Sequence, residues 1–449
     1  MYENCIRRII LALYLPLCWR IYRGVNNNYS TTNPPTGGFF CGLKVLFERK
    51  NMKEQSFDTF MTNTGTLDAQ IRQSTNLPSK EAFLSAMAQK PGRQVRDILI
   101  ETPCNQSCTA CFFNENGGSG KVQLTQEALS ELRSMISVLK KPDPEYFALY
   151  PKEISTALPM LSIMSEQGIT RTLTNGRILN KNGVIDALKK ANIRKLVITV
   201  PGGKDAYAMY TQNNPDEYET LLSNVNLAVR NNFDVSIFMP IFSQNINDIE
   251  NTVDVLGNMN VRNIQFIRVR RFGNAFSLPN EYFMKNDDML TFLETVNRTR
   301  KRAGDKMKLT LFGGSFGPNF FGSSIYRQLA GITEHWPNSR YFCPMIDRQF
   351  VGVSFATKKA YSCFIGMSFE EAQIGYYKDG VITYTKPMLT GESVQNNLRG
   401  MCSENNCEYQ PLCLGGCRMN AFALAKQNNE TNPFFAGQDI CITNTIKNL

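Results

Sequence analysis

The chain has 449 residues, a formal net charge of +10 and 42% apolar residues, which suits two or three domains with large cores. Its basic residues form no stripe interleaved with aromatic side chains beyond the short group Arg268, Arg270 and Arg271, and its single histidine is His335, so a nucleic-acid binder and a histidine-based zinc hydrolase are both disfavoured. The 13 cysteines occur without a convincing secretory signal, which favours a cytoplasmic protein whose cysteines hold metal or do chemistry rather than form disulfides.

Residues 1–51 form an N-terminal extension with a short apolar run, Ile9–Trp19. This run is shorter than the roughly 20 residues that a membrane-spanning helix needs, and Pro16 interrupts it. We therefore expect no membrane span. Two interpretations of the extension stay open: a disordered or membrane-surface segment, or a mis-annotated start, because the sequence from Met52 resembles an ordinary polar N-terminus. Residues 52–94 are expected to form a helical segment that either caps the next domain or grips a leader peptide.

From residue 95 to residue 305, short runs rich in Val, Ile, Leu, Phe and Thr alternate with amphipathic helical stretches. This alternation is typical of βα units and predicts an α/β fold, a partial (β/α)6 TIM-type barrel. The predicted strands are Val95–Glu101, Glu145–Tyr150, Thr170–Thr174, Lys195–Val200, Asp234–Phe242 and Asn263–Arg270. The helical patterns between them include Thr125–Leu139, Ile154–Gln167, Asp216–Asn231 and Ile246–Leu256.

A further helix at about Asn280–Arg302 and a strand at Lys306–Phe312 are expected to lead out of the barrel. Residues 306–339 then form a linker, which is either packed or lines a substrate channel.

Three cysteines follow the first predicted strand: Cys104, Cys108 and Cys111. In βα barrels the loops after the C-terminal ends of the strands form the active site. The loop with this C-x3-C-x2-C spacing is therefore expected on the active face. Three soft thiolates suit one face of a small iron–sulfur cluster and leave one iron open to bind and reduce another molecule. The rival interpretation is a structural zinc site, which normally closes with a fourth Cys or His nearby, and the sequence has none there.

This cysteine spacing, in the loop after the first strand, resembles the signature of the radical S-adenosylmethionine (SAM) superfamily. The resemblance implies a 4Fe-4S cluster on the three cysteines that donates an electron to SAM and so produces a 5′-deoxyadenosyl radical. It also implies SAM-binding residues at the ends of later strands, where Thr174 and Asn175 match a Thr-Asn-Gly motif and Glu153 keeps the glutamate of a Gly-Gly-Glu-Pro motif. The implied SAM-binding set is Glu153, Thr174, Asn175, Thr199, Asn245 and Arg268. One departure is Ala110, which stands where the family usually carries an aromatic residue before the third cysteine.

Seven further cysteines follow residue 340, where the alternation of strands and helices stops: Cys343, Cys363, Cys402, Cys407, Cys413, Cys417 and Cys441. Their spacing resembles the SPASM extension of one branch of the superfamily, which implies an iron–sulfur domain at 340–449 with two auxiliary 4Fe-4S clusters. A single cluster or a zinc site is the alternative. Lys358 and Lys359 stand where this branch usually has glycine.

The same resemblance implies how the seven cysteines are shared. The outer cluster takes Cys402, Cys407, Cys413 and Cys441, and the inner cluster takes Cys343, Cys363 and Cys417. Either a non-cysteine ligand such as Asp347 or the substrate itself completes the inner cluster.

The resemblance finally implies a radical SAM iron–sulfur oxidoreductase, and the leading expectation in this branch is maturation of a ribosomally made peptide by a crosslink, thioether or related oxidation. The alternatives are sulfatase-type formylglycine maturation, oxidation or epimerisation of a small metabolite such as a sugar, and, more remotely, a non-catalytic iron–sulfur electron carrier. The implied partners are a precursor peptide or protein and a flavodoxin- or ferredoxin-type reductant, with no nucleic acid. No residue is identified as catalytic base or hydrogen donor.

Overall fold

The computed structural model describes residues 94–113, 122–139, 148–312, 350–386, 391–399 and 414–437. By its contacts the chain divides into two compact units, Met1–Gly65 and Thr66–Leu449, and all of the described residues belong to the second. The predictions for the N-terminal extension, for residues 52–93 and for the linker beyond residue 312 therefore lie outside the described residues. No helix in the described ranges is long and apolar enough to cross a membrane.

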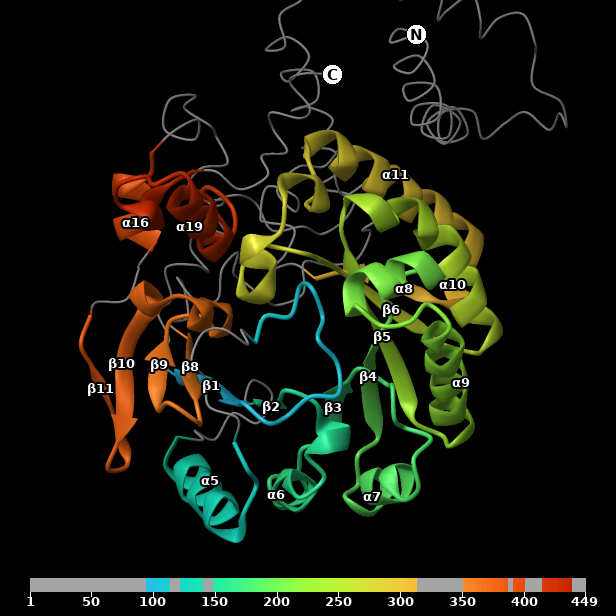
Figure 1. The fold of residues 1–449 in the computed structure, drawn as a ribbon, viewed down its shortest axis with the longest axis horizontal. Helices are drawn as coiled ribbons and strands as arrows, with labels where there is room; N and C mark the ends of the chain where they lie inside the picture. The colour runs from blue at the N-terminus through green and yellow to red at the C-terminus, as the bar shows by residue number, and fades with distance from the viewer. Residues whose placement is uncertain are drawn as a thin grey trace, which may run out of the picture. The chain divides into compact units, whose positions relative to one another are not determined.

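Two sheets carry the parallel strands (Figure 1). The first contains β1 (Gln94–Ile100) and β2 (Ala148–Pro151), and the second contains β3 (Arg171–Thr174), β4 (Lys195–Thr199), β5 (Asp234–Ile241), β6 (Asn263–Arg268) and β7 (Lys308–Leu311) in that order. Every hydrogen-bonded pair of neighbours within these two sets is parallel. The six predicted strands are all present, with slightly different ends, and the α/β class with a parallel sheet is confirmed.

The strand predicted at Lys306–Phe312 does not lead out of the barrel, which corrects the expectation. It forms β7 and pairs in parallel with β6, with Lys308 opposite Asn263. Leu309 is buried in the main core, so the strand gains apolar burial by continuing the sheet. The parallel series is therefore one strand longer than predicted.

Seven helices accompany these strands in the described residues up to 312: α5 (Gln126–Leu139), α6 (Met160–Glu166), α7 (Val184–Lys190), α8 (Lys204–Thr211), α9 (Glu217–Arg230), α10 (Ile249–Asn258) and α11 (Asn286–Ala303). In α5 the buried residues Leu129, Leu132, Met135, Ile136 and Leu139 recur at intervals of three or four, which places them on one face toward the core. Helices α7 and α8 are short, with 7 and 8 residues.

The alternation of burial along β6 shows which face of the strands packs against the helices. Ile264 and Phe266 are buried, whereas Gln265 and Ile267 are partly exposed. Ile264 and Phe266 belong to the main core, and the ring of Phe266 lies 5.7 Å from that of Phe292 in α11. Because side chains alternate between the faces of a strand, Gln265 and Ile267 point away from the helices.

The strands after residue 350 continue the sheet of β1. They are β8 (Phe350–Ser354), β9 (Lys359–Tyr361), β10 (Gln373–Lys378) and β11 (Val381–Tyr384). Strand β8 lies beside β1 and runs parallel to it, and the next three follow in antiparallel order. The cysteine-rich part of the chain is thus joined to the barrel strands through a shared sheet.

The turn between β8 and β9 fixes this join. Buried Glu101, directly after β1, accepts hydrogen bonds from the hydroxyl of Ser354 and, at 3.1 Å, from the backbone N–H of Ala356. In the same turn Lys358 has a φ of +59°, in the left-handed region that favours glycine. Glycine would adopt this conformation without the steric cost that the lysine side chain adds.

A second apolar cluster lies around α16 (Gly391–Asn397), α19 (Arg418–Gln427) and the 3₁₀ turn η8 (Pro433–Phe435). It contains Phe369 and Phe422, whose rings are 5.0 Å apart, together with Phe272 from the loop after β6. The cluster therefore joins α16, α19 and η8 to the loop after β6.

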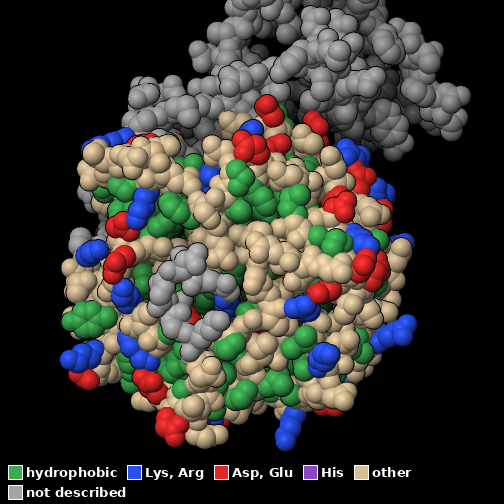
Figure 2. Space-filling view, viewed as in Figure 1, with side chains coloured by type: hydrophobic (Ala, Val, Ile, Leu, Met, Phe, Trp, Pro, Cys, Tyr) green, Lys and Arg blue, Asp and Glu red, His purple; other side chains and the backbone are tan. Residues whose placement is uncertain are grey.

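Charged side chains of both signs are interspersed on the face shown in Figure 2. Neighbours of opposite sign form surface ion pairs, among them Arg133 with Glu166 at 2.7 Å and Arg302 with Asp254 at 3.0 Å. Such exposed pairs contribute little to stability. The described part of this face thus has a mixed rather than a one-signed charge.

Candidate functional site

The three cysteines lie in the loop that follows β1, and all three side chains are partly buried. Burial raises the pKa of Cys104, and it raises the pKa of Cys108 well above the usual value, to which the neighbouring thiols of Cys111 and Cys104 add. The thiols of Cys104 and Cys111 are therefore close enough to Cys108 to oppose its ionisation. A bound metal reverses this balance because a coordinating thiol is deprotonated.

Three thiols in one loop are a donor set that suits an iron–sulfur cluster with one open iron. A 4Fe-4S cluster binds each cysteine through a different iron, so its ligands need not meet at one point.

Asn105 supplies a second observation on fit. Its side-chain oxygen accepts a hydrogen bond of 2.7 Å from the amide of Asn175, which also lies 3.7 Å from the sulfur of Cys104. The amide nitrogen of Asn105 is buried and has no hydrogen-bond partner among the described residues. A buried donor without an acceptor is costly, and sulfur atoms of a cluster beside Cys104 would satisfy it.

The loop after β6 supports the cysteine loop from the other side. The backbone N–H of Asn274 donates to the carbonyl of Cys111 at 2.9 Å, and its side chain donates to the carbonyl of Cys108 at 3.0 Å. Gly273 has a φ of +59°, and a Cβ atom there would lie 2.1 Å from the carbonyl oxygen of Cys111. Only glycine fits this close approach.

Glu153, which follows β2, brings several predicted residues together. One oxygen of its buried carboxylate accepts hydrogen bonds from the hydroxyls of Ser155 and Thr174, both at 2.6 Å. The other accepts from the backbone N–H of Asn175 at 2.7 Å. Burial raises the pKa of Glu153 above its ordinary value, and these hydrogen bonds offset only part of that rise. Three of the predicted SAM-binding residues thus form one network beside Cys104.

The other three predicted SAM-binding residues lie on later strands. Thr199 ends β4 and is partly exposed, and Arg268 ends β6 and is buried. Asn245 is fully buried, and its amide donates to the carbonyls of Pro201 and Pro240 at 2.6 and 2.7 Å. Contact between the amide of Asn245 and a bound molecule would require these hydrogen bonds to break. In this structure Asn245 instead connects the loop after β4 to the loop after β5.

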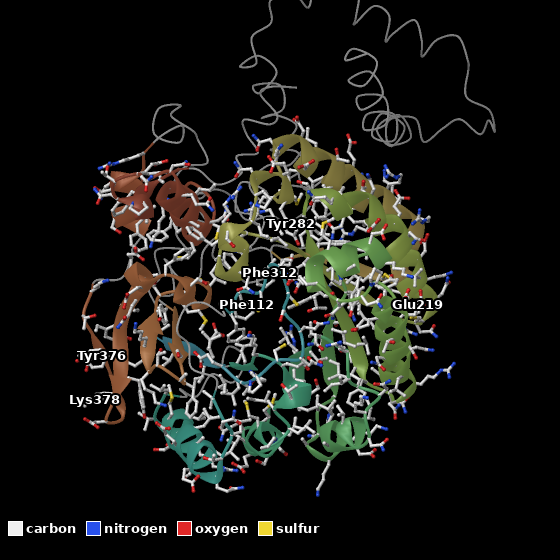
Figure 3. All side chains as sticks on the ribbon, viewed as in Figure 1. Phe112, Glu219, Tyr282, Phe312, Tyr376 and Lys378 are labelled. Atoms are coloured by element: carbon white, nitrogen blue, oxygen red, sulfur yellow. The ribbon has the colours of Figure 1, made fainter. Side chains whose placement is uncertain are left out.

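The small residue Ala110 packs against a group of aromatic rings that sequence analysis missed. Phe242 stacks on Tyr282 with ring centroids 4.7 Å apart and on Tyr210 at 6.3 Å (Tyr282 is labelled in Figure 3). The hydroxyl of Tyr282 lies 3.1 Å from that of Thr109, and burial raises the pKa of Tyr282 to about 12. The aromatic surface near the third cysteine thus comes from α8 and from the segments after β5 and β6.

Only Cys363 and Cys417 of the second cysteine field are described. Cys417 belongs to the second apolar cluster, and Cys363 packs against it, as does Phe112 from the first cysteine loop. The sulfur of Cys417 accepts a hydrogen bond of 3.2 Å from the guanidinium of Arg270. The predicted ligands Cys343, Asp347, Cys402, Cys407, Cys413 and Cys441 lie outside the described residues.

Solved structures with the same fold include peptide-bound proteins. Native anSMEcpe with bound AdoMet and Kp18Cys peptide is similar with a TM-score of 0.50 and 15% identity, over 73% of this chain and 90% of that one. Streptococcus suis SuiB bound to S-adenosylmethionine has a TM-score of 0.54 and 11% identity, over 90% of this chain and 87% of that one. SuiB bound to precursor peptide SuiA has a TM-score of 0.55 and 11% identity, over 97% and 89%. At these identities the likeness shows a shared fold.

Sequence comparison covers the site itself. No curated protein sequence matches the chain. Residues 102–256, which include the three cysteines of the first loop and the Glu153 network, match the family model described as the radical SAM superfamily. With that match and the cysteine loop at the end of β1, residues 102–256 form a radical SAM superfamily domain, and the chain that contains it is a radical SAM enzyme.

Proposed function

We propose that this enzyme matures a ribosomally made precursor peptide by an oxidative crosslink, thioether or related bond. The observation that carries the proposal is the first cysteine loop. It holds three cysteines after β1, with Cys108 close to the other two thiols, beside the buried Glu153 network and within the segment that matches this superfamily. When bound, a 4Fe-4S cluster and SAM supply the 5′-deoxyadenosyl radical that removes a hydrogen atom from the substrate.

The residues of the first site divide into ligands and supports. Cys104, Cys108 and Cys111 would hold the cluster, and the unpartnered amide of Asn105 would donate to its sulfur atoms. Gly273 and Asn274 hold the backbone of the loop through the contacts at Cys111 and Cys108. A fixed loop keeps the cluster from shifting relative to SAM, and small shifts of reacting groups cost rate.

For SAM we propose Glu153, Thr174, Asn175, Thr199, Asn245 and Arg268, in two roles. Thr199 presents a partly exposed hydroxyl at the end of β4, and Arg268 supplies a buried positive charge suited to a carboxylate. Glu153 and Asn245 act as supports, because their polar atoms already bind the turn after β3 and the loops after β4 and β5.

A wall for the substrate is proposed on the face of β5 to β7 that points away from the helices. It carries the partly exposed residues Phe238, Gln265, Ile267 and Phe312. The rings of Phe238 and Phe312 lie 6.4 Å apart (Phe312 is labelled in Figure 3). Aromatic and aliphatic groups with one amide suit an apolar side chain held by a few polar contacts, and they exclude water from a reactive intermediate.

The shared fold supports a peptide as the substrate class. Two of the similar structures hold peptides, Kp18Cys in one and the precursor SuiA in the other, and this chain spans about nine tenths of the length of each. Sulfatase-type formylglycine maturation also acts on a polypeptide side chain, so the product distinguishes it from crosslinking.

We extend the proposal to two auxiliary clusters in the second cysteine field. Cys363 and Cys417 lie in one apolar cluster, and soft thiolates in dry surroundings suit iron–sulfur centres. These clusters would carry away the electron that net oxidation of the substrate releases. A flavodoxin- or ferredoxin-type protein is the proposed reductant for the first cluster.

The test uses anaerobically reconstituted protein with SAM, dithionite and a short peptide encoded beside its gene. We expect a peptide product whose mass is lowered by a pair of hydrogen atoms and whose fragmentation shows a bond between two side chains, formed by the wild type and by Cys41→Ala, and not by Cys104→Ala. Cys41 is a matched control because it belongs to neither cysteine field. If SAM is cleaved but neighbouring peptides stay unmodified while a sugar-type metabolite is oxidised, the peptide proposal is wrong.

A further inference from the structure

The loop after β6 contacts both cysteine fields. Asn274 binds the backbone of Cys108 and Cys111, as described above. Three residues earlier, the backbone N–H of Arg271 donates to the side chain of Asn420 in α19 at 2.8 Å. Between them, the backbone N–H of Gly273 donates to the hydroxyl of Ser368 at 2.9 Å. This short loop thus connects the first cysteine loop to the second cysteine field.

Arg270, in the same loop, reaches the second field through its side chain. It is buried, 6% exposed, and its Nη1 atom lies 3.2 Å from Sγ of Cys417, which is 8% exposed. The guanidinium carbon also lies 4.9 Å from the centre of the Phe272 ring. Cys417 immediately precedes α19. A cation is therefore held against a thiol in an apolar setting, where charge interactions are strong.

The chemistry of this pair favours an anionic sulfur. A neutral thiol is a weak acceptor, whereas a thiolate bound to iron carries negative charge and accepts strong, charge-assisted hydrogen bonds. Hydrogen bonds to the sulfurs and nearby charge are among the factors that set the reduction potential of iron–sulfur clusters.

We propose that Arg270 is a positioning residue that raises the reduction potential of the auxiliary cluster bound by Cys417. The inference rests on the proposed auxiliary clusters. Reduction adds one electron and so one negative charge to the cluster, and the adjacent cation stabilises that charge. A higher potential makes the cluster a better acceptor for the electron released when substrate is oxidised.

The experiment measures the potential without interference from the first cluster. The full-length chain with Cys104→Ala, Cys108→Ala and Cys111→Ala is reconstituted anaerobically, its iron is counted, and its reduction is followed by EPR during a redox titration. Arg270→Gln and Arg270→Met remove the charge, and having two neutral variants guards against misfolding of one. Arg270→Lys keeps the charge without the planar fork. Arg271→Gln is the matched control, because Arg271 is an equally buried neighbour whose guanidinium binds Asn280 and Gln427.

We expect the neutral variants to lower the equilibrium constant for one-electron reduction of one cluster about tenfold, which corresponds to about 59 mV. Arg270→Lys should shift it in the same direction by less, and Arg271→Gln should leave it unchanged. Unchanged potentials in fully loaded Arg270 variants, or an equal shift in Arg271→Gln, would overturn the inference. If the background protein itself binds almost no iron, the proposed auxiliary clusters fail and the inference fails with them; normal iron with unchanged potentials refutes the role of Arg270 alone.

Discussion

At the scale of single residues, Gly273 determines whether the first cysteine loop can adopt its shape. A side chain there would meet the carbonyl oxygen of Cys111 at 2.1 Å and the Cα of Phe112 at 2.6 Å. Both neighbours are backbone atoms, which cannot rotate out of the way. The position also has a φ of +59°, a conformation that costs roughly 1–2 kcal/mol for a residue with a side chain.

Gly273→Ala is therefore expected to lower the free energy of unfolding by more than this conformational cost and to reduce the iron held by the first cluster. The measurements are urea unfolding and iron counting after anaerobic reconstitution. Gly168→Ala is the control, because Gly168 has a similar φ of +68° with nothing within 4 Å of its Cβ position. If both variants lose the same stability and keep the same iron, the close approach at Cys111 has no consequence.

Glu101 shows how a single carboxylate couples β1 to the β8–β9 turn. Burial raises its pKa above the ordinary value of 4.5, although hydrogen bonds from Ser354 and Ala356 lower it again. The native state thus keeps a proton at a pH where the unfolded chain has released it. The free energy of unfolding therefore falls as pH rises from the ordinary value through the raised pKa.

The prediction compares metal-free wild type with Glu101→Gln, which does not titrate. The stability of the wild type relative to this variant should decline with rising pH across that window, as followed by urea unfolding. Glu250→Gln should show a small slope of the opposite sign, because Arg302 and Arg298 lower the pKa of this partly exposed carboxylate. A flat difference between wild type and Glu101→Gln would mean that burial of Glu101 does not shift its titration.

At the scale of elements, β5 and β6 each have one face packed against the helices and one face that points away from them. Phe266 of β6 is fully buried against α11, whereas Phe238 of β5 is partly exposed on the proposed substrate wall. Phe266→Ala is expected to lower the free energy of unfolding by roughly 3–5 kcal/mol. Phe238→Ala should cost far less stability and should instead raise KM for the peptide.

The readouts are urea unfolding and peptide kinetics, with SAM cleavage in the absence of peptide as the internal reference. That cleavage should be unchanged in Phe238→Ala because Phe238 is proposed to contact only the substrate. A large loss of stability in Phe238→Ala, with KM unchanged, would place Phe238 in the core and refute the proposed wall.

At the scale of the whole molecule, patterns along short stretches of sequence predicted the strands and the loops that follow them. Runs of Val, Ile and Leu predicted the parallel strands, and the carboxyl ends of such strands meet at one edge, so Cys104, Glu153 and Thr174 could be placed together. Sequence alone did not predict that β7 continues the sheet or that β8 pairs with β1, because strand pairing depends on contacts between distant segments.

The supports of the site were missed for the same reason. Asn274 binds Cys108 from 166 positions away, and Arg270 binds Cys417 from 147 positions away. The apparent lack of an aromatic residue at Ala110 is another case, because Tyr210 and Tyr282 come to it from other elements. Spacing along the chain reveals ligands that share a loop, but not the residues that hold the loop in place.

The most direct test of the account is SAM cleavage by the full-length chain. Anaerobically reconstituted protein with dithionite and SAM should produce 5′-deoxyadenosine, and should hold about 12 iron atoms if all three clusters are of the 4Fe-4S type. Cys104→Ala should abolish the product and lose about 4 iron atoms while keeping the auxiliary clusters. A wild-type protein with a fully loaded first cluster that forms no 5′-deoxyadenosine would contradict the assignment of radical chemistry to Cys104, Cys108 and Cys111.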